Sequence, residues 1–234
     1  DGVSLINTIN SIMGVDLDTL KPKFSLQGKI SHGGYCGPAV KPIALNMVSQ
    51  IATDPETVGL PISGIGGIST WSDAVEFMLL GSSSVQLCTA VMHHGFRIIE
   101  DLNAGLEGWM KRKNFSKLDD FIGKTAPNIV DWKHLNLHYK SVASIDKDKC
   151  IGCDVCYVSC NDTTHQCIAI DKKGGNRKPH VVQADCVGCN LCYLVCPVDN
   201  CITMKPVDTG LKPLTWDDYT KSGGKGYGEV YRRH

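Results

Sequence analysis

The sequence predicts an α/β domain followed by a small cysteine-rich domain, and two observations predict this class. Across residues 1–113, short apolar segments alternate three times with amphipathic helical segments. Across residues 146–206, eight cysteines fall into two runs of identical spacing. The polar, irregular residues 114–145 between them are predicted to be a linker, and residues 207–234 a C-terminal tail. A chain of 234 residues is long enough for two domains.

The elements of the first domain are predicted to follow the order β-α-β-α-β-α. The apolar segments predict strands over residues 2–9, 60–65 and 84–88, and the spacing of apolar side chains predicts helices over residues 41–52, 70–80 and 96–113. Strands that alternate with helices favour parallel pairing through right-handed crossovers. This order is compatible with both an open doubly wound sheet and a closed barrel.

The cysteines of the second domain have the spacing C-x2-C-x2-C-x3-C twice. The runs are Cys150, Cys153, Cys156 and Cys160, then Cys186, Cys189, Cys192 and Cys196, the second being followed by Pro197. This spacing is typical of two [4Fe-4S] clusters in which the last cysteine of each run binds the other cluster. We therefore expect Cys196 to complete the first ligand set and Cys160 the second. Zinc sites and disulfide frameworks use other spacings and are disfavoured.

The composition restricts the environment and the partners. The chain has 24 basic and 24 acidic residues, so it presents no charge excess for nucleic acid or an anionic membrane, and we expect neither as a partner. No apolar run approaches the roughly 20 residues that span a bilayer. Because cluster ligands must be reduced thiols, we expect a cytoplasmic protein.

Three loops that follow predicted strands are candidates for binding, because α/β folds of both kinds place ligands at these ends. Asn7 and Thr8 have side chains that suit a heterocycle, although a turn or helix cap is the alternative. The glycine loop 64–68 offers bare N–H groups for a phosphate. Together with residues 88–90 after the next strand, it is similar to the phosphate site of barrels, and plain turns are the alternative.

Several motifs resemble the dihydropyrimidine dehydrogenase family. In the first domain they are residues 6–8 (Ile-Asn-Thr), 33–39 (Gly-Gly-Tyr-Cys-Gly-Pro-Ala), 41–45 (Lys-Pro-Ile-Ala-Leu), 66–68 (Gly-Gly-Ile) and 85–90 (Val-Gln-Leu-Cys-Thr-Ala). In the second they are residues 160–162 (Cys-Asn-Asp), where ferredoxins usually have Cys-Pro, and residues 196–204. The resemblance covers residues 1–206 and is greatest to bacterial subunits that carry FMN and clusters without an NADH-binding part.

The resemblance implies the fold. It predicts the C-terminal portion of an FMN-binding (β/α)8 barrel, about the last three βα units, followed by a bacterial-type 2[4Fe-4S] ferredoxin domain. It also implies a fragment that lacks about five strands, together with the catalytic cysteine, a lysine near the flavin and two asparagines of the substrate site. No catalytic residue is therefore expected here, and neither Cys36 nor Cys88 is expected to replace that cysteine.

The resemblance also implies the binding residues. It predicts that Asn7 and Thr8 contact the pyrimidine. The residues that it predicts to contact FMN are Gly37, Gly66, Gly67, Cys88 and Thr89. The phosphate is expected near Gly66, Gly67 and Thr89, which agrees with the chemistry of bare N–H groups and a hydroxyl.

The implied activity is the reduction of uracil or thymine to the 5,6-dihydropyrimidine. Electrons would come from NADH or NADPH through the FAD of a partner flavoprotein subunit and the two clusters, which implies a hetero-oligomer. One alternative is a flavoenzyme similar to dihydroorotate dehydrogenase. Another is a non-catalytic, ferredoxin-type electron-transfer module, which would hold clusters but no flavin.

Other conspicuous residues receive ordinary interpretations. His134 and His138 have helical spacing but no third ligand nearby, so a metal role is disfavoured. Cys167 and Cys201 fall outside the two ligand sets and are expected to be buried thiols. Residues 223–226 lack the spacing of a P-loop and are expected to form a flexible tail.

Overall fold

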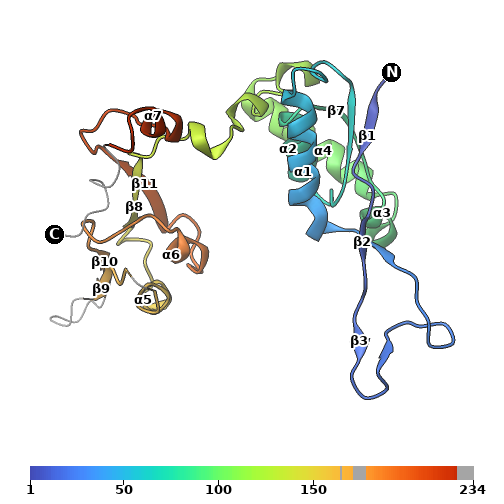
Figure 1. Cartoon of the computed structure of the whole chain (residues 1–234), viewed down its shortest axis with the longest axis horizontal. Coiled ribbons are helices and arrows are strands. Elements are labelled where there is room, and N and C mark those ends of the chain that lie inside the picture. The colour runs from blue at the N-terminus through green and yellow to red at the C-terminus, as the bar shows by residue number, and fades with distance from the viewer. Residues whose placement is uncertain (164, 171–177, 226–234) are drawn as a thin grey trace. The chain divides into compact units, whose positions relative to one another are not determined.

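The computed structural model describes residues 1–163, 165–170 and 178–225, and the chain divides into two compact units (Figure 1). The first unit is Asp1–Ile129 and the second is Val130–His234. Among the helices of the described residues, none has the length and apolar character needed to cross a membrane.

A parallel sheet of three strands forms the centre of the first unit. Its order is β1 (Val3–Leu5), β6 (Ile62–Ile65), β7 (Ser82–Gln86), and both pairings are parallel. The helices α1 (Lys41–Thr53) and α2 (Trp71–Leu79) pack against the sheet, and α4 (Ile98–Lys113) packs on α2. Parallel strands bring their carboxyl ends to one edge, which places the loops after β1, β6 and β7 side by side.

The two faces of this sheet differ because side chains alternate along a strand. Leu5 and Ile62 point into the core, where Phe77 of α2 is fully buried. The other face carries a hydrogen-bonded polar group: the Gln86 amide donates from Nε2 to the hydroxyls of Ser4 and Ser63, each at 2.8 Å. The hydrophobic core of the unit therefore lies between the sheet and its helices.

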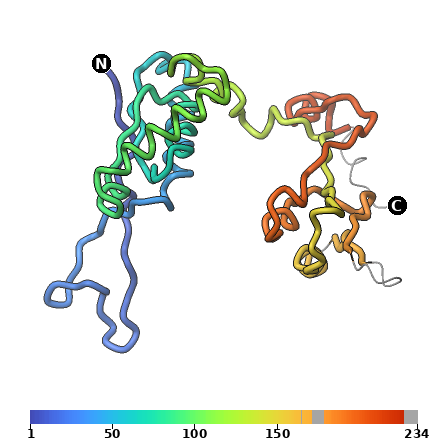
Figure 2. Tube along the Cα trace, turned by 180° about the vertical axis from the view of Figure 1, so that it is seen from behind, coloured from blue at the N-terminus to red at the C-terminus, as the bar shows by residue number. Residues whose placement is uncertain are grey.

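The strand predicted over residues 2–9 is shorter in the structure, where β1 ends at Leu5 and a separate strand, β2 (Ile9–Ser11), begins at Ile9. The pairing of β2 with β5 (Gly33–Tyr35) is antiparallel, and so is that of β3 (Val15–Asp16) with β4 (Lys21–Pro22). These strands form a long arm that projects from the body of the unit (Figures 1 and 2). No pattern in the sequence predicts this arm.

The remaining elements of the first unit lie close to their predicted positions. The observed α1, α2 and β6 differ from the predicted ranges by two residues or fewer at each end. Strand β7 begins and ends two residues earlier than predicted, because the chain turns at residues 87–88 into an unpredicted helix, α3 (Thr89–His94). The start of α2 is fixed by a capping box in which Thr70 and Asp73 satisfy each other's backbone N–H groups.

The linker predicted over residues 114–145 is wrong as a single segment. Phe121 is fully buried and lies 4.9 Å, ring centre to ring centre, from Trp109 of α4. The backbone N–H of Gly123 donates to the Met78 carbonyl at 2.9 Å. Residues up to 129 therefore complete the first unit. The mostly polar composition of this segment predicts a linker, although the buried ring of Phe121 packs it on the first unit.

In the second unit, two antiparallel pairs of strands surround the cysteine runs. The pairs are β8 (Lys140–Ile145) with β11 (Ile202–Val207), and β9 (Ile168–Ile170) with β10 (Pro179–Val181). The helices α5 (Val155–Asn161) and α6 (Leu191–Leu194) each begin inside one run. Cysteines are six of the ten buried residues that form the core of this unit, and four of these six are expected cluster ligands.

The tail predicted over residues 207–234 is wrong for its first part. Residue 207 is the last of β11, and the tail contains a further helix, α7 (Trp216–Lys221). The backbone N–H of Leu137 donates to the Leu214 carbonyl at 2.7 Å, and the ring of Trp216 packs on Trp132. The part of the predicted glycine tail beyond residue 225 lies outside the described residues.

The two histidines for which a metal role was disfavoured contact this segment. His138 is buried with Nδ1 2.6 Å from the Lys212 carbonyl, and His134 faces Asp217.

Candidate functional site

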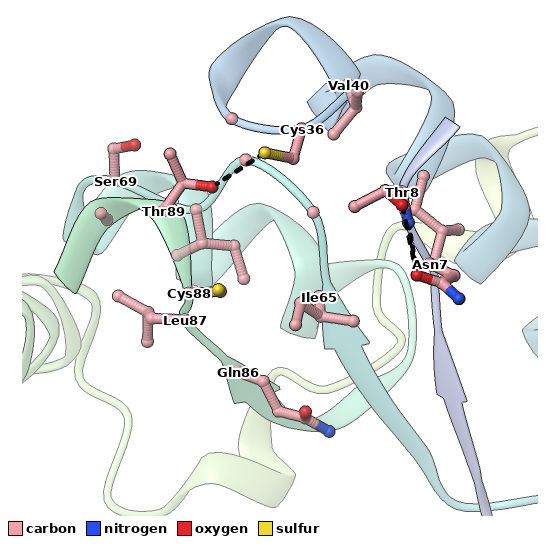
Figure 3. Close-up of a pocket in the computed structure, with 16 residues that line it drawn as sticks. Asn7, Thr8, Cys36, Val40, Ile65, Ser69, Gln86, Leu87, Cys88 and Thr89 are labelled. Atoms are coloured by element: carbon pink, nitrogen blue, oxygen red, sulfur yellow. Dashed lines mark hydrogen bonds between the residues drawn. The ribbon is translucent and has the colours of Figure 1, made fainter. Parts of the chain in front are cut away.

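A cavity of about 220 Å³ lies at the edge of the sheet where the three parallel strands end (Figure 3). Four segments line it: residues 6–8 after β1, 36–40 before α1, 65–69 after β6 and 86–90 around the end of β7. None of the residues that line it is charged. All seven residues expected to bind substrate or FMN are among them: Asn7, Thr8, Gly37, Gly66, Gly67, Cys88 and Thr89. The structure therefore brings the three candidate loops together.

The glycine loop after β6 has a backbone shape that only glycine adopts easily. Gly66 and Gly67 have φ angles of 136° and 78°. A Cβ atom on Gly67 would lie 2.8 Å from the Gly37 carbonyl oxygen and 3.0 Å from Lys41 Cβ. A Cβ atom on Gly66 would lie 2.8 Å from Ala44 Cβ. The loop therefore fits closely over the start of α1. Its peptide groups line the cavity, because glycine has no side chain that would cover them.

The end of β7 supplies the opposite wall. Thr89, the first residue of α3, donates a hydrogen bond from Oγ1 to Cys36 Sγ at 3.4 Å, which joins this wall to the loop before α1 (Figure 3). Cys36 and Cys88 are both exposed and line the cavity. Cys36 thus lies beside the residues predicted to contact the flavin, and Cys88 is one of them.

Asn7 and Thr8 lie at the edge of the cavity opposite Thr89 (Figure 3). The backbone N–H of Thr8 donates to Asn7 Oδ1 at 2.7 Å, a local bond of the kind found in turns. A Cβ atom on Gly34 would collide with the Thr8 side chain, so the base of the arm packs directly on this residue. The turn and the binding interpretations are thus compatible, since the bond uses only the oxygen of the Asn7 amide.

An ion-pair cluster beneath the glycine loop was missed by the sequence analysis. Lys41 Nζ lies 2.6 Å from Asp73 Oδ1 and 3.0 Å from Glu76 Oε2. The other oxygen of Asp73 accepts hydrogen bonds from the backbone N–H groups of Ser69, at 2.9 Å, and Thr70, at 2.8 Å. Asp73 therefore ties the loop that follows Gly67 to α1. In the sequence, the signal for Asp73 is the Thr-x-x-Asp pattern at residues 70–73, which is typical of a capping box at the start of a helix.

The charges in this cluster stabilise one another. Burial alone would raise the pKa of Asp73, but the hydrogen bonds from Lys41, Ser69 and Thr70 outweigh burial and hold the pKa below its ordinary value of 3.8. The hydrogen bond to Asp73 likewise raises the pKa of Lys41. Both groups are therefore charged at neutral pH, and the ammonium of Lys41 is neutralised by two carboxylates.

The cysteines gather around two small hollows in the second unit. One hollow is lined by Cys150, Cys153, Cys156 and Cys196, together with Cys201. The other is lined by Cys160, Cys186, Cys189 and Cys192, together with Cys167. The last cysteine of each run thus lies with the first three cysteines of the other run, which is the grouping expected for crossed ligation. Each hollow also holds a fifth cysteine that the sequence analysis left out of the ligand sets.

The surroundings of the hollows suit clusters held by thiolates. Apolar side chains such as Ile145, Val198 and Leu191 supply most of the remaining lining. Burial raises the pKa of the thiols of Cys156 and Cys192 to about 11 when no iron is bound. Iron binding must therefore displace protons from these thiols, as is general for metal sites of this kind.

The glycine loop provides a sharp test of the cavity. Replacing Gly67 by alanine is expected to weaken FMN binding at least tenfold, because the new methyl group meets the Gly37 carbonyl and Lys41. The measurement is fluorescence titration of the flavin-free protein with FMN.

Gly59→Ala is the matched control for this variant. Gly59 also has a positive φ angle, of 88°, but an added Cβ would meet nothing within 4 Å. Gly59→Ala should therefore lose some stability through backbone strain and still bind FMN normally. Equal FMN affinity in the two variants would contradict the assignment of the glycine loop.

Two family models match the chain. Residues 1–110 match the family "Dihydroorotate dehydrogenase" and residues 143–204 match the family "4Fe-4S dicluster domain". With the cavity and the paired cysteine hollows, these matches define the class: an α/β fold of the FMN-barrel type followed by a dicluster domain, with FMN and two [4Fe-4S] clusters as cofactors.

The similar proteins that have been curated agree with this class. The NAD-dependent dihydropyrimidine dehydrogenase subunit PreA of Escherichia coli is 44% identical over 207 residues, which is 88% of this chain and 50% of that protein. The chloroplastic dihydropyrimidine dehydrogenase (NADP(+)) of Arabidopsis thaliana is 45% identical over 126 residues, 53% of this chain and 30% of that protein. The catalytic subunit of dihydroorotate dehydrogenase B (NAD(+)) of Thermococcus kodakarensis is 42% identical over 123 residues, 53% of this chain and 38% of that protein.

The expected resemblance is confirmed: the chain is similar to a dihydropyrimidine dehydrogenase subunit over 88% of its length. The alignment with the E. coli subunit is long enough to span most of both matched regions. The chain spans about half the length of that relative.

Proposed function

We propose that this chain belongs to the FMN and iron-sulfur subunit of a dihydropyrimidine dehydrogenase, which reduces uracil or thymine to the 5,6-dihydro base. The observation that carries this proposal is the alignment with the E. coli subunit, which continues through the cysteine runs. The alignments with dihydroorotate dehydrogenases cover only about half of the chain.

We assign the cavity residues by their chemistry. The peptide groups of Gly66 and Gly67 and the hydroxyl of Thr89 hold the phosphate of FMN, because N–H and O–H donors suit an anion where no charged side chain lines the wall. Gly37 and Cys88 contact the flavin nearby. Asn7 and Thr8 orient the pyrimidine at the opposite edge, where the Nδ2 group of Asn7 donates to a carbonyl of the base.

We assign the cysteines by the hollows that they line. Cys150, Cys153, Cys156 and Cys196 hold one cluster, and Cys160, Cys186, Cys189 and Cys192 hold the other. When bound, FMN supplies hydride transfer to the base, and the clusters supply one-electron transfer. The protein positions these groups and excludes water from the clusters through the apolar walls of the two hollows.

The electrons come from NADH or NADPH through a second, FAD-containing subunit, so the working enzyme is a hetero-oligomer. The relative from E. coli is itself named a subunit and NAD-dependent, which supports this arrangement. We place the enzyme in the cytoplasm, because thiol-ligated clusters require reduced cysteines.

The test uses the full-length protein in which this chain occurs, purified without oxygen. Its flavin is reduced with dithionite and then mixed separately with uracil and with orotate, while flavin absorbance is recorded. Rapid reoxidation by uracil and slow reoxidation by orotate is the expected result. The reverse preference would establish a dihydroorotate-type enzyme. A preparation with clusters and no flavin would establish an electron-transfer module.

A further inference from the structure

Each cysteine hollow contains one thiol more than a four-iron cluster uses. The additional residues are Cys167 in one hollow and Cys201 in the other, and they are 6% and 2% exposed. Each directly precedes a strand, Cys167 before β9 and Cys201 before β11. The two residues therefore occupy corresponding places in the internal repeat, although the sequence alone assigns neither a role.

The two additional thiols make different contacts. Cys167 Sγ lies 3.5 Å from Cys160 Sγ, and the backbone N–H of Cys167 donates to the same sulfur at 3.3 Å. The thiol of Cys201 instead donates to the Asp146 carbonyl, with 3.7 Å between sulfur and oxygen. The Cys160 sulfur thus has two potential donors from one neighbouring residue, the thiol and the backbone N–H of Cys167. The thiol of Cys201 lies near the thiols of Cys150 and Cys196, but it also has the Asp146 carbonyl as an acceptor.

The direction of the Cys167 bond follows from the ligand role proposed for Cys160. A sulfur that binds iron carries no proton, so the S–H group of the pair belongs to Cys167 and Cys167 is the donor. A reduced cluster carries one more negative charge than an oxidised cluster. A donor to a ligand sulfur therefore stabilises the reduced form, and hydrogen bonds of this kind are among the factors that set cluster potentials.

We propose that Cys167 is a positioning residue that raises the reduction potential of one cluster by donating hydrogen bonds from its thiol and backbone N–H to Cys160 Sγ. The proposal rests on the proposed ligand role of Cys160. It makes the two clusters unequal: the thiol and the backbone N–H of Cys167 both donate to one ligand sulfur, whereas the thiol of Cys201 has a backbone carbonyl as a competing acceptor. No bond to iron is formed by Cys167, and its proton stays on its sulfur.

The experiment compares Cys167→Ala, Cys167→Ser and Cys201→Ala in the full-length protein with its clusters assembled. Iron and acid-labile sulfide are measured first, and the two cluster potentials are then measured by redox titration monitored by electron paramagnetic resonance. The iron content of the unmodified protein, measured in the same series, tests the proposed ligand sets separately.

In Cys167→Ala, both clusters should remain and one midpoint potential should become more negative. The ratio of reduced to oxidised cluster at a fixed potential should fall about tenfold, in line with the loss of one hydrogen bond to a charged group. Cys167→Ser keeps a donor and should restore part of the shift. Cys201→Ala should shift a cluster potential by clearly less than Cys167→Ala does, because its thiol also has the Asp146 carbonyl as an acceptor.

Three results would overturn the proposal. The first is an unchanged pair of potentials in Cys167→Ala. The second is an equal shift in Cys201→Ala, which would mean that any buried thiol has the same effect. The third is loss of iron from Cys167→Ala, which would make Cys167 a ligand or a structural residue.

Discussion

Replacing Cys192 by alanine is expected to remove one of the two clusters and to loosen the whole second unit. The iron content should fall from about eight to about four per chain, because a cubane needs all four thiolates. Cys192 is buried, and cysteines make up most of the core of this unit. Since binding of a structural metal site contributes directly to folding, loss of one cluster removes much of what holds β8 and β11 against α5 and α6.

This prediction is checked by iron analysis together with amide hydrogen exchange of the whole chain. Exchange should accelerate in β8 and β11 and stay unchanged in β6, which lies in the first unit. Cys167→Ala is the matched control: it removes a buried cysteine that lines the same hollow but belongs to no ligand set. If Cys192→Ala kept all its iron, the proposed ligand set would be wrong.

Replacing Asp73 by asparagine is expected to weaken FMN binding by ten- to thirtyfold. The carboxylate accepts hydrogen bonds from Lys41 and from two backbone N–H groups of the loop that follows Gly67. Hydrogen bonds that involve a charged group contribute about 1.5–3 kcal/mol, so the loss of this charge releases the loop from α1. The peptide N–H groups of Gly66 and Gly67, the proposed phosphate donors, would then lose their fixed positions.

Glu76→Gln is the matched control for Asp73→Asn. Glu76 also binds Lys41, at 3.0 Å, but its side chain is 46% exposed, and no recorded hydrogen bond joins it to the loop. Titration with FMN and with riboflavin separates the effects, because riboflavin lacks the phosphate. Asp73→Asn should weaken FMN far more than riboflavin, and Glu76→Gln should alter neither much. An equal loss for both flavins would show that Asp73 supports the fold only.

Acid should weaken the same contact in the unmodified protein. The pKa of Asp73 is lowered in the folded state, so its stabilising effect is complete above the ordinary value of 3.8 and is lost as the pH falls through the lower, folded-state pKa. Thermal unfolding of the first unit between pH 5 and pH 2 (about the range that such carboxylates span) should therefore show a smaller acid-dependent loss in Asp73→Asn than in the unmodified protein. The same dependence in both proteins would remove Asp73 from this explanation.

Local chemistry made much of this protein predictable. The spacing of apolar side chains located α1, α2, α4 and β6, because a helix or strand must place such residues on one face. The repeated cysteine spacing identified the clusters, since the short run itself sets which thiols can converge. The glycines after β6 predicted a loop with bare N–H groups, and the positive φ angles and near contacts of Gly66 and Gly67 are those that glycine accepts most easily.

The tertiary structure decided what depends on partners distant in sequence. The burial of Phe121 against Trp109, and the packing of Trp216 on Trp132, assigned segments that look polar and irregular to the two units. The antiparallel arm formed because β2 met β5, a pairing that no local pattern specified. Lys41 and Asp73 are 32 positions apart, and Cys160 and Cys167 are seven positions apart. Neither pair lies within one helix or strand, so the spacing of the residues does not predict either contact. The spacing of residues in the sequence determines which side chains can meet within one segment. Contacts between distant segments form only when the whole chain packs.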